Sequence, residues 1–315
     1  MIEIDKKDSD AARAAWLYYH EELTQGEIAR ELSISRSTVT RLLQRAKHDG
    51  LVQVSLNVTA STFKAERDLE RAFGLARVRI VPAPNDEVMQ KRWLGHVAAE
   101  LIVPMMTDGS IAAVGWGTTL LAMSGSLVGQ TPIMEAQVVP LVGGLHNAKV
   151  GTDTNEIARY VAQHFNATVR PLLAPIYVQD EATALGLAND PGIRDALDLA
   201  RKASIVIYSL GAMHNDSTMF QLGHITNEQK NFLQRQGAVG DIACRWIDGQ
   251  GRPVELPSSI NPIGISLDDL KRIPRRLAVA GGALKKDVVL AALRGGFNTE
   301  LVTDERTADY LLRNC

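Results

Sequence analysis

Apolar positions near the N-terminus recur with a helical period. In "DAARAAWLYYHEE" the positions that repeat at steps of three and four are Ala11, Ala15, Tyr18 and Tyr19. This spacing predicts a first helix, with Asp8 or Ser9 as its N-cap.

Two further apolar periods follow in "LTQGEIARELSISRSTVTRLLQRAKHDG", separated by the polar turn "SIS". Thr24 and Glu27 have the spacing of a capping box that opens a second helix, and Ser35 can cap a third. The positions predicted to face inward are Ile28, Ala29, Leu32, Ile34, Val39, Leu42 and Leu43. Two short helices joined by a tight turn are typical of a helix-turn-helix. The following "GLVQVSLNV" suggests a strand, which is compatible with a winged variant.

The outward positions of the third helix all carry groups that can hydrogen-bond. They are Arg36, Ser37, Thr38, Thr40, Arg41, Gln44 and Arg45. On a helix that enters the major groove, we expect base-edge contacts from Arg36, Ser37, Thr38 and Arg41, and Thr40 is also expected to contact DNA. Phosphate contacts are expected from Thr24, Gln25 and Arg45, because a helix N-terminus and a basic side chain both suit an anion. The alternative is an ordinary helical hairpin with a solvated polar face.

Residues 58–74 read as a linker helix that ends at Gly74. Its apolar positions are Phe63, Leu69 and Phe73. They could pack between subunits or on the larger domain, and the pattern does not distinguish the two.

From residue 75 to the C-terminus, nearly continuous apolar strands alternate with amphipathic helical segments. Examples are "RVRIV", "SIAAVGWG", "AQVVPLVGG", "SIVIYSLG", "RRLAVAGG" and "NTELVTD". Such strands are typical of a parallel sheet covered on both faces. The sequence therefore predicts three parts: a small all-α (winged) helix-turn-helix domain over 1–57, a linker helix over 58–74, and a doubly wound, Rossmann-like α/β domain over 75–315.

Composition supports a globular two-domain protein. The chain has 315 residues, 45% of them hydrophobic and 22% charged, with a net charge of −2. Locally, residues 30–48 carry five Lys or Arg against one Glu, which can form a basic face for a phosphate backbone. A polar, acidic N-terminus and the lack of an eighteen-residue apolar run predict a cytoplasmic protein without a membrane partner.

Metal and thiol chemistry find no support in the sequence. Cys244 and Cys315 are far apart and lack CxxC or CxxH neighbours, and the seven histidines show no HxH, HxxxH or HExxH spacing. No GxSxG or Cys/His nucleophile arrangement occurs either. We therefore expect no metal, no cofactor and no catalytic residue.

Glycine-rich turns follow several predicted strands, where ligands bind in doubly wound sheets. In "SIAAVGWGTTLLAM", Gly115 and Gly117 allow close backbone approach, and Thr118 and Thr119 bring hydroxyls to the next helix start, where a phosphate could be held. The turn lacks the GxGxxG spacing and the Walker lysine, so nucleotide binding is not indicated. Tight turn geometry alone is the simpler explanation.

Two other segments carry charged residues suited to a hydroxylated ligand. "QGAVGDIACRWID" places Asp241 after a glycine, near an expected helix start, where its carboxylate could accept sugar hydroxyls. "AVAGGALKKDVVLAAL" places Lys285 and Lys286 at another helix start, where an ammonium could meet a phosphate or a carbonyl. His146 and His224 fall in loops near this inferred pocket. Each residue taken singly is better explained as a cap or a solvated charge.

The order of these motifs resembles the SorC/DeoR-type sugar-binding transcriptional regulators. The resemblance rests on residues 15–57 together with "ERAFGLARVRIVP", "AVGWGTTL", "PLVGG", "GAVGDIACRWID", "LAVAGG" and "LVTDERTADYLL", and it covers almost the whole chain. It implies an effector domain with a fold similar to sugar-phosphate isomerases but without catalytic use. It also implies a homo-oligomer, a tetramer or dimer of dimers, on paired operator half-sites.

The resemblance also implies roles for individual residues. Gly117, Thr118 and Thr119 match the family's phosphate-holding turn, Asp241 its acidic hydroxyl acceptor, and Lys285 the lysine after "AGG". Gly143 and Gly144 match a ligand-lining turn. "PIYVQDEA" occupies a stretch that varies between members, so Tyr177 and Gln179 are candidates for sugar selection.

The sequence thus predicts a transcriptional regulator, with repression more typical than activation, controlled by a sugar, polyol or sugar phosphate. The competing class is a sugar-phosphate isomerase with a fused DNA-binding module, in which Asp241 and Lys285 could serve as acid and base.

Overall fold

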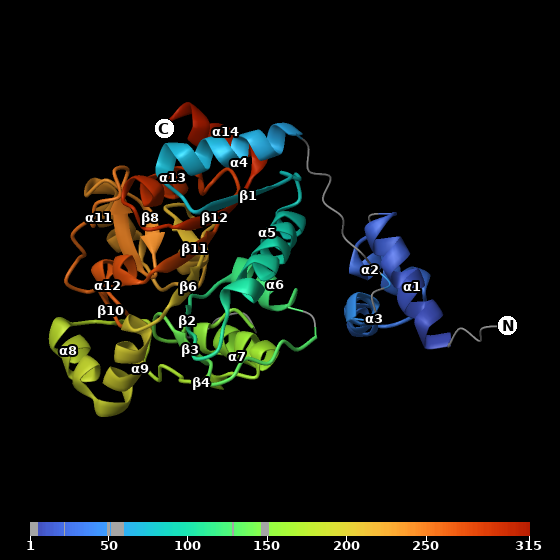
Figure 1. Cartoon of the computed structure of the whole chain (residues 1–315), viewed down its shortest axis with the longest axis horizontal. Helices are drawn as coiled ribbons and strands as arrows, with labels where there is room; N and C mark the ends of the chain where they lie inside the picture. The colour runs from blue at the N-terminus through green and yellow to red at the C-terminus, as the bar shows by residue number, and fades with distance from the viewer. Residues whose placement is uncertain (1–5, 22, 49–50, 52–59, 128, 146–150) are drawn as a thin grey trace. The chain divides into compact units, whose positions relative to one another are not determined.

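The computed structural model describes residues 6–21, 23–48, 51, 60–127, 129–145 and 151–315 (Figure 1). Contacts divide the chain into two compact units, residues 1–57 and residues 58–315. The segment expected to form a wing lies almost wholly outside the described residues.

The smaller unit consists of α1 (Lys6–Tyr19), α2 (Gln25–Glu31) and α3 (Arg36–His48) in the part that the structure describes. Its core is formed by Ala11, Ala14, Ala15, Leu17, Ile28, Val39, Leu43 and Ala46, with Ala29, Leu32, Ile34 and Leu42 packed partly buried against them. The expected inward faces of α2 and α3 are therefore confirmed. One boundary was wrong: α1 begins at Lys6, so Asp8 and Ser9 lie inside the helix and do not cap it.

The larger unit is built on a parallel sheet, which has seven strands in the described residues, in the order β1-β12-β11-β6-β2-β3-β4. The strands are β1 (Arg77–Val81), β2 (Ile111–Val114), β3 (Gln137–Pro140), β4 (Thr168–Val169), β6 (Ile205–Tyr208), β11 (Arg275–Val279) and β12 (Glu300–Asp304). All positions of β6 and β12 are buried, because both faces of the sheet are covered. The predicted doubly wound architecture is confirmed.

The helices of this unit have the following bounds: α4 (Ala60–Phe73), α5 (Glu87–Ile102), α6 (Thr118–Ser124), α7 (Thr154–Phe165), α8 (Glu181–Asn189), α9 (Pro191–Arg201), α10 (Thr218–Gln221), α11 (Asn227–Arg235), α12 (Leu267–Arg272), α13 (Lys286–Arg294) and α14 (Glu305–Arg313). A short 3-10 helix covers Val103–Met105. The linker helix α4 belongs to this unit and packs on β1 and α14 (Figure 1). Among the described residues no helix has the length and apolar character needed to span a bilayer.

The direction of winding reverses between β2 and β6. The chain runs outward from β2 to β3 and β4, and later from β6 to β11 and β12. The loops after β2 and β6 therefore diverge at this point, which opens a crevice at the carboxyl ends of the strands.

An antiparallel ribbon beside the sheet was not predicted. It contains β7 (Leu210–Ala212), β8 (Ala238–Ile242) and β9 (Arg245–Asp248), and a separate pair joins β5 (Tyr177–Val178) to β10 (Asn261–Pro262). Asp241 lies in β8 opposite Gly211. The expectation that Asp241 lies near a helix start was therefore wrong, and a turn with positive φ at Ala243 and Cys244 follows it instead.

Candidate functional site

The first candidate site is the polar face of α2 and α3. Thr24 caps α2, with its Oγ1 accepting from the Glu27 amide at 3.3 Å while its own amide donates to Glu27 Oε2 at 2.8 Å. The Thr24 hydroxyl also donates to Glu27 Oε2, at 2.6 Å, and this bond together with the one from the Thr24 amide lowers the pKa of Glu27. Ser35 Oγ accepts from the Thr38 amide at 3.1 Å, so the predicted capping box and the predicted cap of α3 are both confirmed. The two caps fix where each helix begins.

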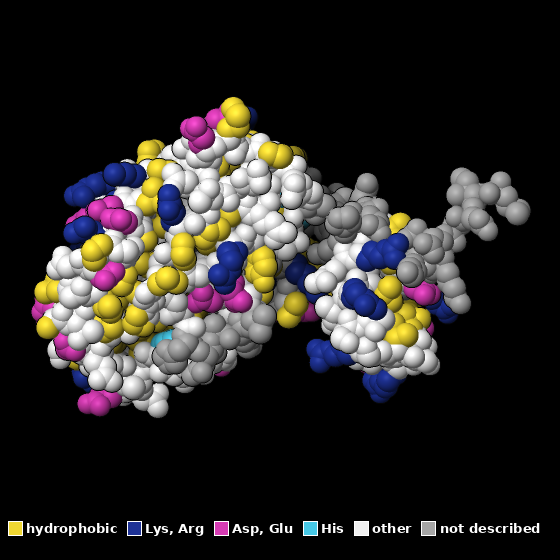
Figure 2. Space-filling model, turned by 90° about the horizontal axis from the view of Figure 1, so that it is seen from below, with side chains coloured by type: hydrophobic (Ala, Val, Ile, Leu, Met, Phe, Trp, Pro, Cys, Tyr) yellow, Lys and Arg dark blue, Asp and Glu magenta, His cyan; other side chains and the backbone are white. Residues whose placement is uncertain are grey.

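The side chains expected to contact DNA lie at or near the surface of this face. Arg36, Ser37 and Arg41 are exposed, and Thr38 and Arg45 are half-buried. Lys and Arg side chains are spread over the visible face of the small unit (Figure 2). A basic face of this kind can replace counterions on a phosphate backbone.

Gln25 and Thr40 are joined to each other. Thr40 Oγ1 lies 3.0 Å from Gln25 Oε1 and 3.1 Å from the Arg36 carbonyl oxygen, and both are acceptors for its hydroxyl. This contact ties the start of α2 to the middle of α3 and leaves the Gln25 amide nitrogen as a donor. Thr40, expected from the sequence to contact DNA, thus also joins α3 to α2, a contact that periodicity did not indicate.

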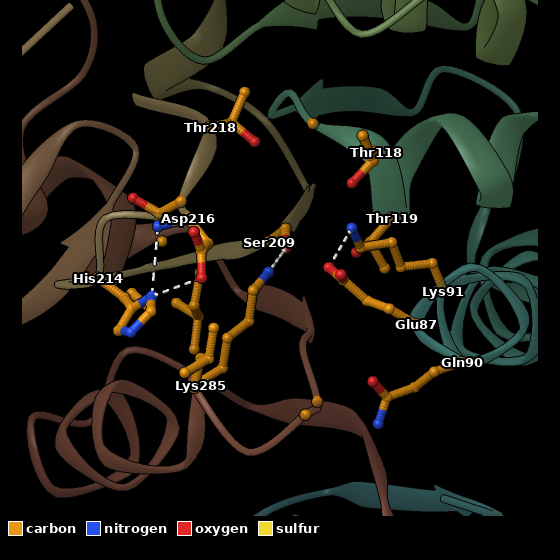
Figure 3. Close-up of a pocket in the computed structure, with 18 of the residues that line it drawn as sticks. Glu87, Gln90, Lys91, Thr118, Thr119, Ser209, His214, Asp216, Thr218 and Lys285 are labelled. Carbon is orange, nitrogen blue, oxygen red and sulfur yellow. Dashed lines mark hydrogen bonds and ion pairs between the residues drawn. The ribbon is translucent and has the colours of Figure 1, made fainter. Parts of the chain in front are cut away.

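The second candidate site is a cavity of about 280 Å³ in the larger unit, at the crevice between β2 and β6. It is lined by Glu87, Gln90, Lys91, Trp116, Gly117, Thr118, Thr119, Ser209, Leu210, Gly211, Ala212, His214, Asp216, Ser217, Thr218, Asp241, Gly281, Gly282, Ala283, Leu284 and Lys285. The structure thus brings together five residues singled out from the sequence: Gly117, Thr118, Thr119, Asp241 and Lys285. Figure 3 labels three of them, Thr118, Thr119 and Lys285.

The β2–α6 turn forms one wall. Gly117 has φ of +111°, a conformation that favours glycine, and it precedes the first residue of α6. Thr119 is only 3% exposed, while Thr118 is half-buried. Gly115 lies just outside the lining, where a Cβ would be 3.3 Å from the Cβ of Tyr208. Close packing of β2 on β6 therefore accounts for Gly115.

Asp241 is buried and Lys285 is half-buried, and the two groups bring opposite signs of charge to the cavity. Burial raises the pKa of Asp241 to about 6 and lowers the pKa of Lys285 to about 8. Asp241 Oδ2 accepts from the Cys244 amide at 3.0 Å, whereas Oδ1 has no hydrogen-bond partner among the described residues. Lys285 Nζ lies 3.2 Å from Ser209 Oγ. Buried charges with so few partners are typical of a ligand site.

Gly211 is needed at its position because of Asp241. A Cβ at residue 211 would lie 1.8 Å from Asp241 Oδ1, which is far inside contact distance. The bare backbone of β7 therefore allows the carboxyl group to occupy its place. This close approach is a non-local pairing that the "SLG" motif by itself did not reveal.

The first two turns of α5 form the wall that sequence reasoning missed. Lys91 Nζ forms an ion pair with Glu87 Oε1 at 2.5 Å, and this contact lowers the pKa of Glu87. Gln90 is largely buried. Figure 3 shows Glu87 and Lys91 across the cavity from Lys285. The segment "EVMQKRW" carries no local signal for a site, because α5 reaches the cavity only through the position of β1 in the sheet.

The segment after β7 adds a third polar wall. His214 Nδ1 lies 3.3 Å from both the amide nitrogen and Oδ2 of Asp216. Ser217 Oγ is buried without a hydrogen-bond partner among the described residues. Together the walls offer hydroxyl, amide, carboxylate and ammonium groups around a few apolar side chains. This combination suits a small, polyhydroxylated ligand.

Several residues expected at the ligand site lie elsewhere. Gly143 and Gly144 pack against the chain at 174–175, the Tyr177 hydroxyl donates to the Cys244 carbonyl at 3.3 Å, and Gln179 is exposed; none of them lines the cavity. His224 does not line it either, and His146 lies outside the described residues. Lys286 sits over the Tyr310 ring, so Lys285 is the member of the pair that lines the cavity.

Comparison with protein families gives two matches. Residues 58–313 match the model described as "Putative sugar-binding domain", and residues 14–59 match the MarR family. The first match contains every residue that lines the cavity, and the second contains α2 and α3.

Similar proteins cover nearly the whole chain. The transcriptional regulator LsrR of Enterobacter sp. (strain 638) is 32% identical over 305 residues, covering 96% of this chain and 92% of that protein. The deoxyribonucleoside regulator of Bacillus subtilis (strain 168) is 30% identical over 311 residues, covering 98% and 99%. The full-length sorbitol operon regulator SorC from Klebsiella pneumoniae has a TM-score of 0.73 at 24% identity, covering 98% and 100%, and this likeness concerns the fold.

Proposed function

The chain belongs to the SorC/DeoR-type family of sugar-binding transcriptional regulators. From this premise we propose that a sugar, polyol or sugar phosphate bound in the cavity controls the affinity of the protein for operator DNA. The observation that supports this most is the cavity itself. It lies where the strand order of the sheet reverses, and it contains a buried carboxyl group with one unpartnered oxygen and a half-buried ammonium group of lowered pKa. Burying such groups is unfavourable unless a ligand uses them.

The proposed ligand contacts follow from the chemistry of each wall. Asp241 accepts hydroxyl groups of the ligand, and Lys285 donates to a hydroxyl, carbonyl or phosphate oxygen. Thr118 and Thr119, with the amides at the start of α6, hold the other polar end. Glu87, Lys91 and Ser217 complete the ring of polar contacts.

On DNA, we propose that α3 reads the major groove through Arg36, Ser37, Thr38 and Arg41. Thr24, Gln25 and Arg45 contact phosphates, with the Gln25 amide held in place by Thr40. Since one helix-turn-helix reads one half-site, the regulator acts as a homo-oligomer on paired half-sites. Sedimentation equilibrium tests this, because a tetramer or dimer of dimers has four times the mass of the 34.3 kDa chain.

A thermal-shift screen tests the effector. Pentoses, hexoses, hexitols and their phosphate esters are added to the full chain, and a ligand present at 100 times its Kd should stabilise it by about 2.7 kcal/mol. The active compound is then added to the complex with a duplex selected from a random-sequence library by the wild-type protein. A change in DNA affinity supports the proposal. Thermal stabilisation with unchanged DNA affinity would contradict it.

A second candidate function is sugar-phosphate isomerisation. It is favoured by the presence in one cavity of two groups, Asp241 and Lys285, whose pKa values of about 6 and about 8 suit proton transfer near neutral pH. The relatives are regulators, which favours control over catalysis. Turnover of ribose 5-phosphate or glucose 6-phosphate, abolished by Asp241→Asn, would establish the enzyme alternative.

A further inference from the structure

The linker helix α4 is attached to the sheet by an unusual pair of contacts. β1 is at one end of the strand order and pairs with β12 alone among the described strands, so its other edge leaves alternate amides without a strand partner. Val78 N donates to Glu70 Oε1 and Ile80 N donates to Glu66 Oε1, both at 2.9 Å. Two carboxyl groups of α4 thus accept the hydrogen bonds that backbone carbonyl groups of a neighbouring strand would otherwise accept.

The spacing of the two glutamates fits the strand that they cap. Four residues of helix rise about 6 Å, and two residues of strand span about 6.6 Å, so Glu66 and Glu70 reach successive outward amides of β1. Leu69, on the same face, is fully buried. We call Glu66 and Glu70 with the amides of Val78 and Ile80 the edge clamp.

The edge clamp includes a carboxyl group whose burial is energetically unfavourable. Glu66 is 5% exposed, and burial raises its pKa in spite of the Ile80 amide and of Arg79, whose Nη1 lies 3.4 Å from Glu66 Oε2. Apolar side chains of α4, chiefly Leu69, already pack against the core of the larger unit. The glutamates add a directional attachment, which fixes the position of α4 along β1.

The clamped elements connect the two functional sites. α4 is the first described element after the DNA-binding unit, which ends at residue 57. At its other end, β1 leads to α5, where Glu87, Gln90 and Lys91 line the cavity. Gly95 of α5 packs so closely on α6 that a Cβ there would be 2.5 Å from the Met123 amide nitrogen. Two walls of the cavity, α5 and α6, therefore form one packed pair, and α5 of this pair contacts β1.

We propose that Glu66 and Glu70 are positioning residues that make α4 move with the edge of the sheet and so transmit occupancy of the cavity to the DNA-binding unit. This inference rests on the proposed function, and it adds the route by which the two sites are coupled. If the clamp were only a cap for the sheet edge, removing it would lower stability and leave the effector response intact.

Hydrogen exchange on the full chain tests the attachment without any ligand. In the double variant Glu66→Ala/Glu70→Ala, the amides of Val78 and Ile80 should exchange at least about fivefold faster, because each loses its acceptor. Glu66→Gln/Glu70→Gln keeps a carbonyl acceptor at each position and should restore slow exchange. Asp68→Ala, which removes a half-buried carboxylate from the same helix, is the matched control. Unchanged exchange in the alanine variant would overturn the clamp.

DNA titration tests the transmission. The probes are the duplex selected by the wild type and whichever of ribose 5-phosphate, glucose 6-phosphate, sorbitol 6-phosphate or their parent sugars shifts its melting temperature most. Coupling of about 5- to 150-fold is expected for the wild type, Asp68→Ala and the glutamine variant. In the alanine variant it should fall below twofold, with effector affinity and effector-free DNA affinity each within threefold of wild type.

Full coupling in the alanine variant would overturn the proposal. Loss of effector binding in that variant would also overturn it, because the clamp would then act on the cavity itself. A wild type whose DNA binding responds to no compound would contradict the proposed function, and the transmission role would fail with it. The exchange measurement distinguishes these outcomes, since it reports the clamp alone.

Discussion

The two polar surfaces of this protein differ in how they hold their charge. The arginines on α3 that we expect to contact DNA, Arg36 and Arg41, are exposed, whereas in the cavity Asp241 is buried and Lys285 is half-buried, and both have few hydrogen-bond partners. Exposed charge costs little to maintain, acts over a Debye length and is weakened by salt. Buried charge destabilises the ligand-free protein, and it increases the affinity for a ligand that forms hydrogen bonds or an ion pair with it. The first surface thus suits rapid association with a polyanion, and the second suits selection of a small molecule.

The largest effect should come from Asp241→Asn. The variant keeps an acceptor for the Cys244 amide and loses the charge, so effector affinity should fall about 100-fold while DNA affinity without effector is retained. The empty protein should become more stable, because a pKa raised from 3.8 to about 6 corresponds to roughly 3 kcal/mol of unfavourable burial. Isothermal titration and thermal melting measure the two effects. A less stable variant with normal effector affinity would contradict the assignment.

The same variant has a defined pH dependence. Because the folded-state pKa of Asp241 lies above its unfolded value, this group binds more protons in the folded protein between pH 3.8 and about 6, and its contribution to wild-type stability falls as pH rises through this window. The stabilisation by asparagine should therefore be full above about pH 7 and should disappear near pH 4. An equal gain at both pH values would exclude burial of the charge as its cause.

Arg36→Ala should weaken binding to the selected duplex by about 5- to 150-fold, the range for a lost base-edge contact. Effector affinity should be unchanged. The affinity for a random-sequence duplex should fall less, because only the selected duplex presents the base that Arg36 contacts. Arg45→Ala is the comparison variant: it should weaken both duplexes alike and lower the slope of log affinity against log salt by about one. Equal losses on both duplexes for Arg36→Ala would move Arg36 to the phosphate contacts.

Thr119→Ala should reduce effector affinity by about tenfold, with DNA affinity preserved, because a single neutral hydrogen-bonding group is removed. Val is the shape-matched control and should behave like Ala. Fluorescence anisotropy with the duplex and titration with the effector separate the two sites. Reduced DNA affinity in effector-free Thr119→Ala would show that the sites are not separable in this way.

Thr24→Ala should have the smallest effect. Loss of the cap on α2 should cost about 1 kcal/mol of stability in the smaller unit, which hydrogen exchange in α2 would report. DNA affinity should fall modestly and effector affinity should not change. Thr24→Ser is the conservative control. Slower exchange at Thr24→Ala than in the wild type would refute the capping role.

Much of the smaller unit could be predicted from the sequence because its determinants are local. Thr24 and Glu27 are three residues apart, Ser35 caps the helix that follows it, and the inward positions recur with the helical period. The Gln25–Thr40 contact could not be predicted, since it depends on the angle between α2 and α3. The start of α1 was misplaced because Asp8 and Ser9 have the composition of a cap without its geometry.

The cavity could be predicted only in part. Gly117, Thr118 and Lys285 follow buried parallel strands, and the carboxyl ends of those strands meet at one edge of the sheet. The wall from α5 escaped detection because β1, the strand before it, lies at the far end of the strand order. Asp241 was expected beside a helix, but antiparallel pairing of β8 with β7 brings it to the cavity. Both misses concern pairings between segments distant in the chain.

The central claim is that effector binding in the cavity and DNA affinity are coupled, and a reciprocal titration tests it most directly. The Kd of the selected duplex is measured with and without saturating effector, and the Kd of the effector with and without saturating duplex. Coupling requires the two ratios to be equal and different from one, in a range of about 5- to 150-fold. Two ratios of one, from a protein that binds both ligands, would contradict the account.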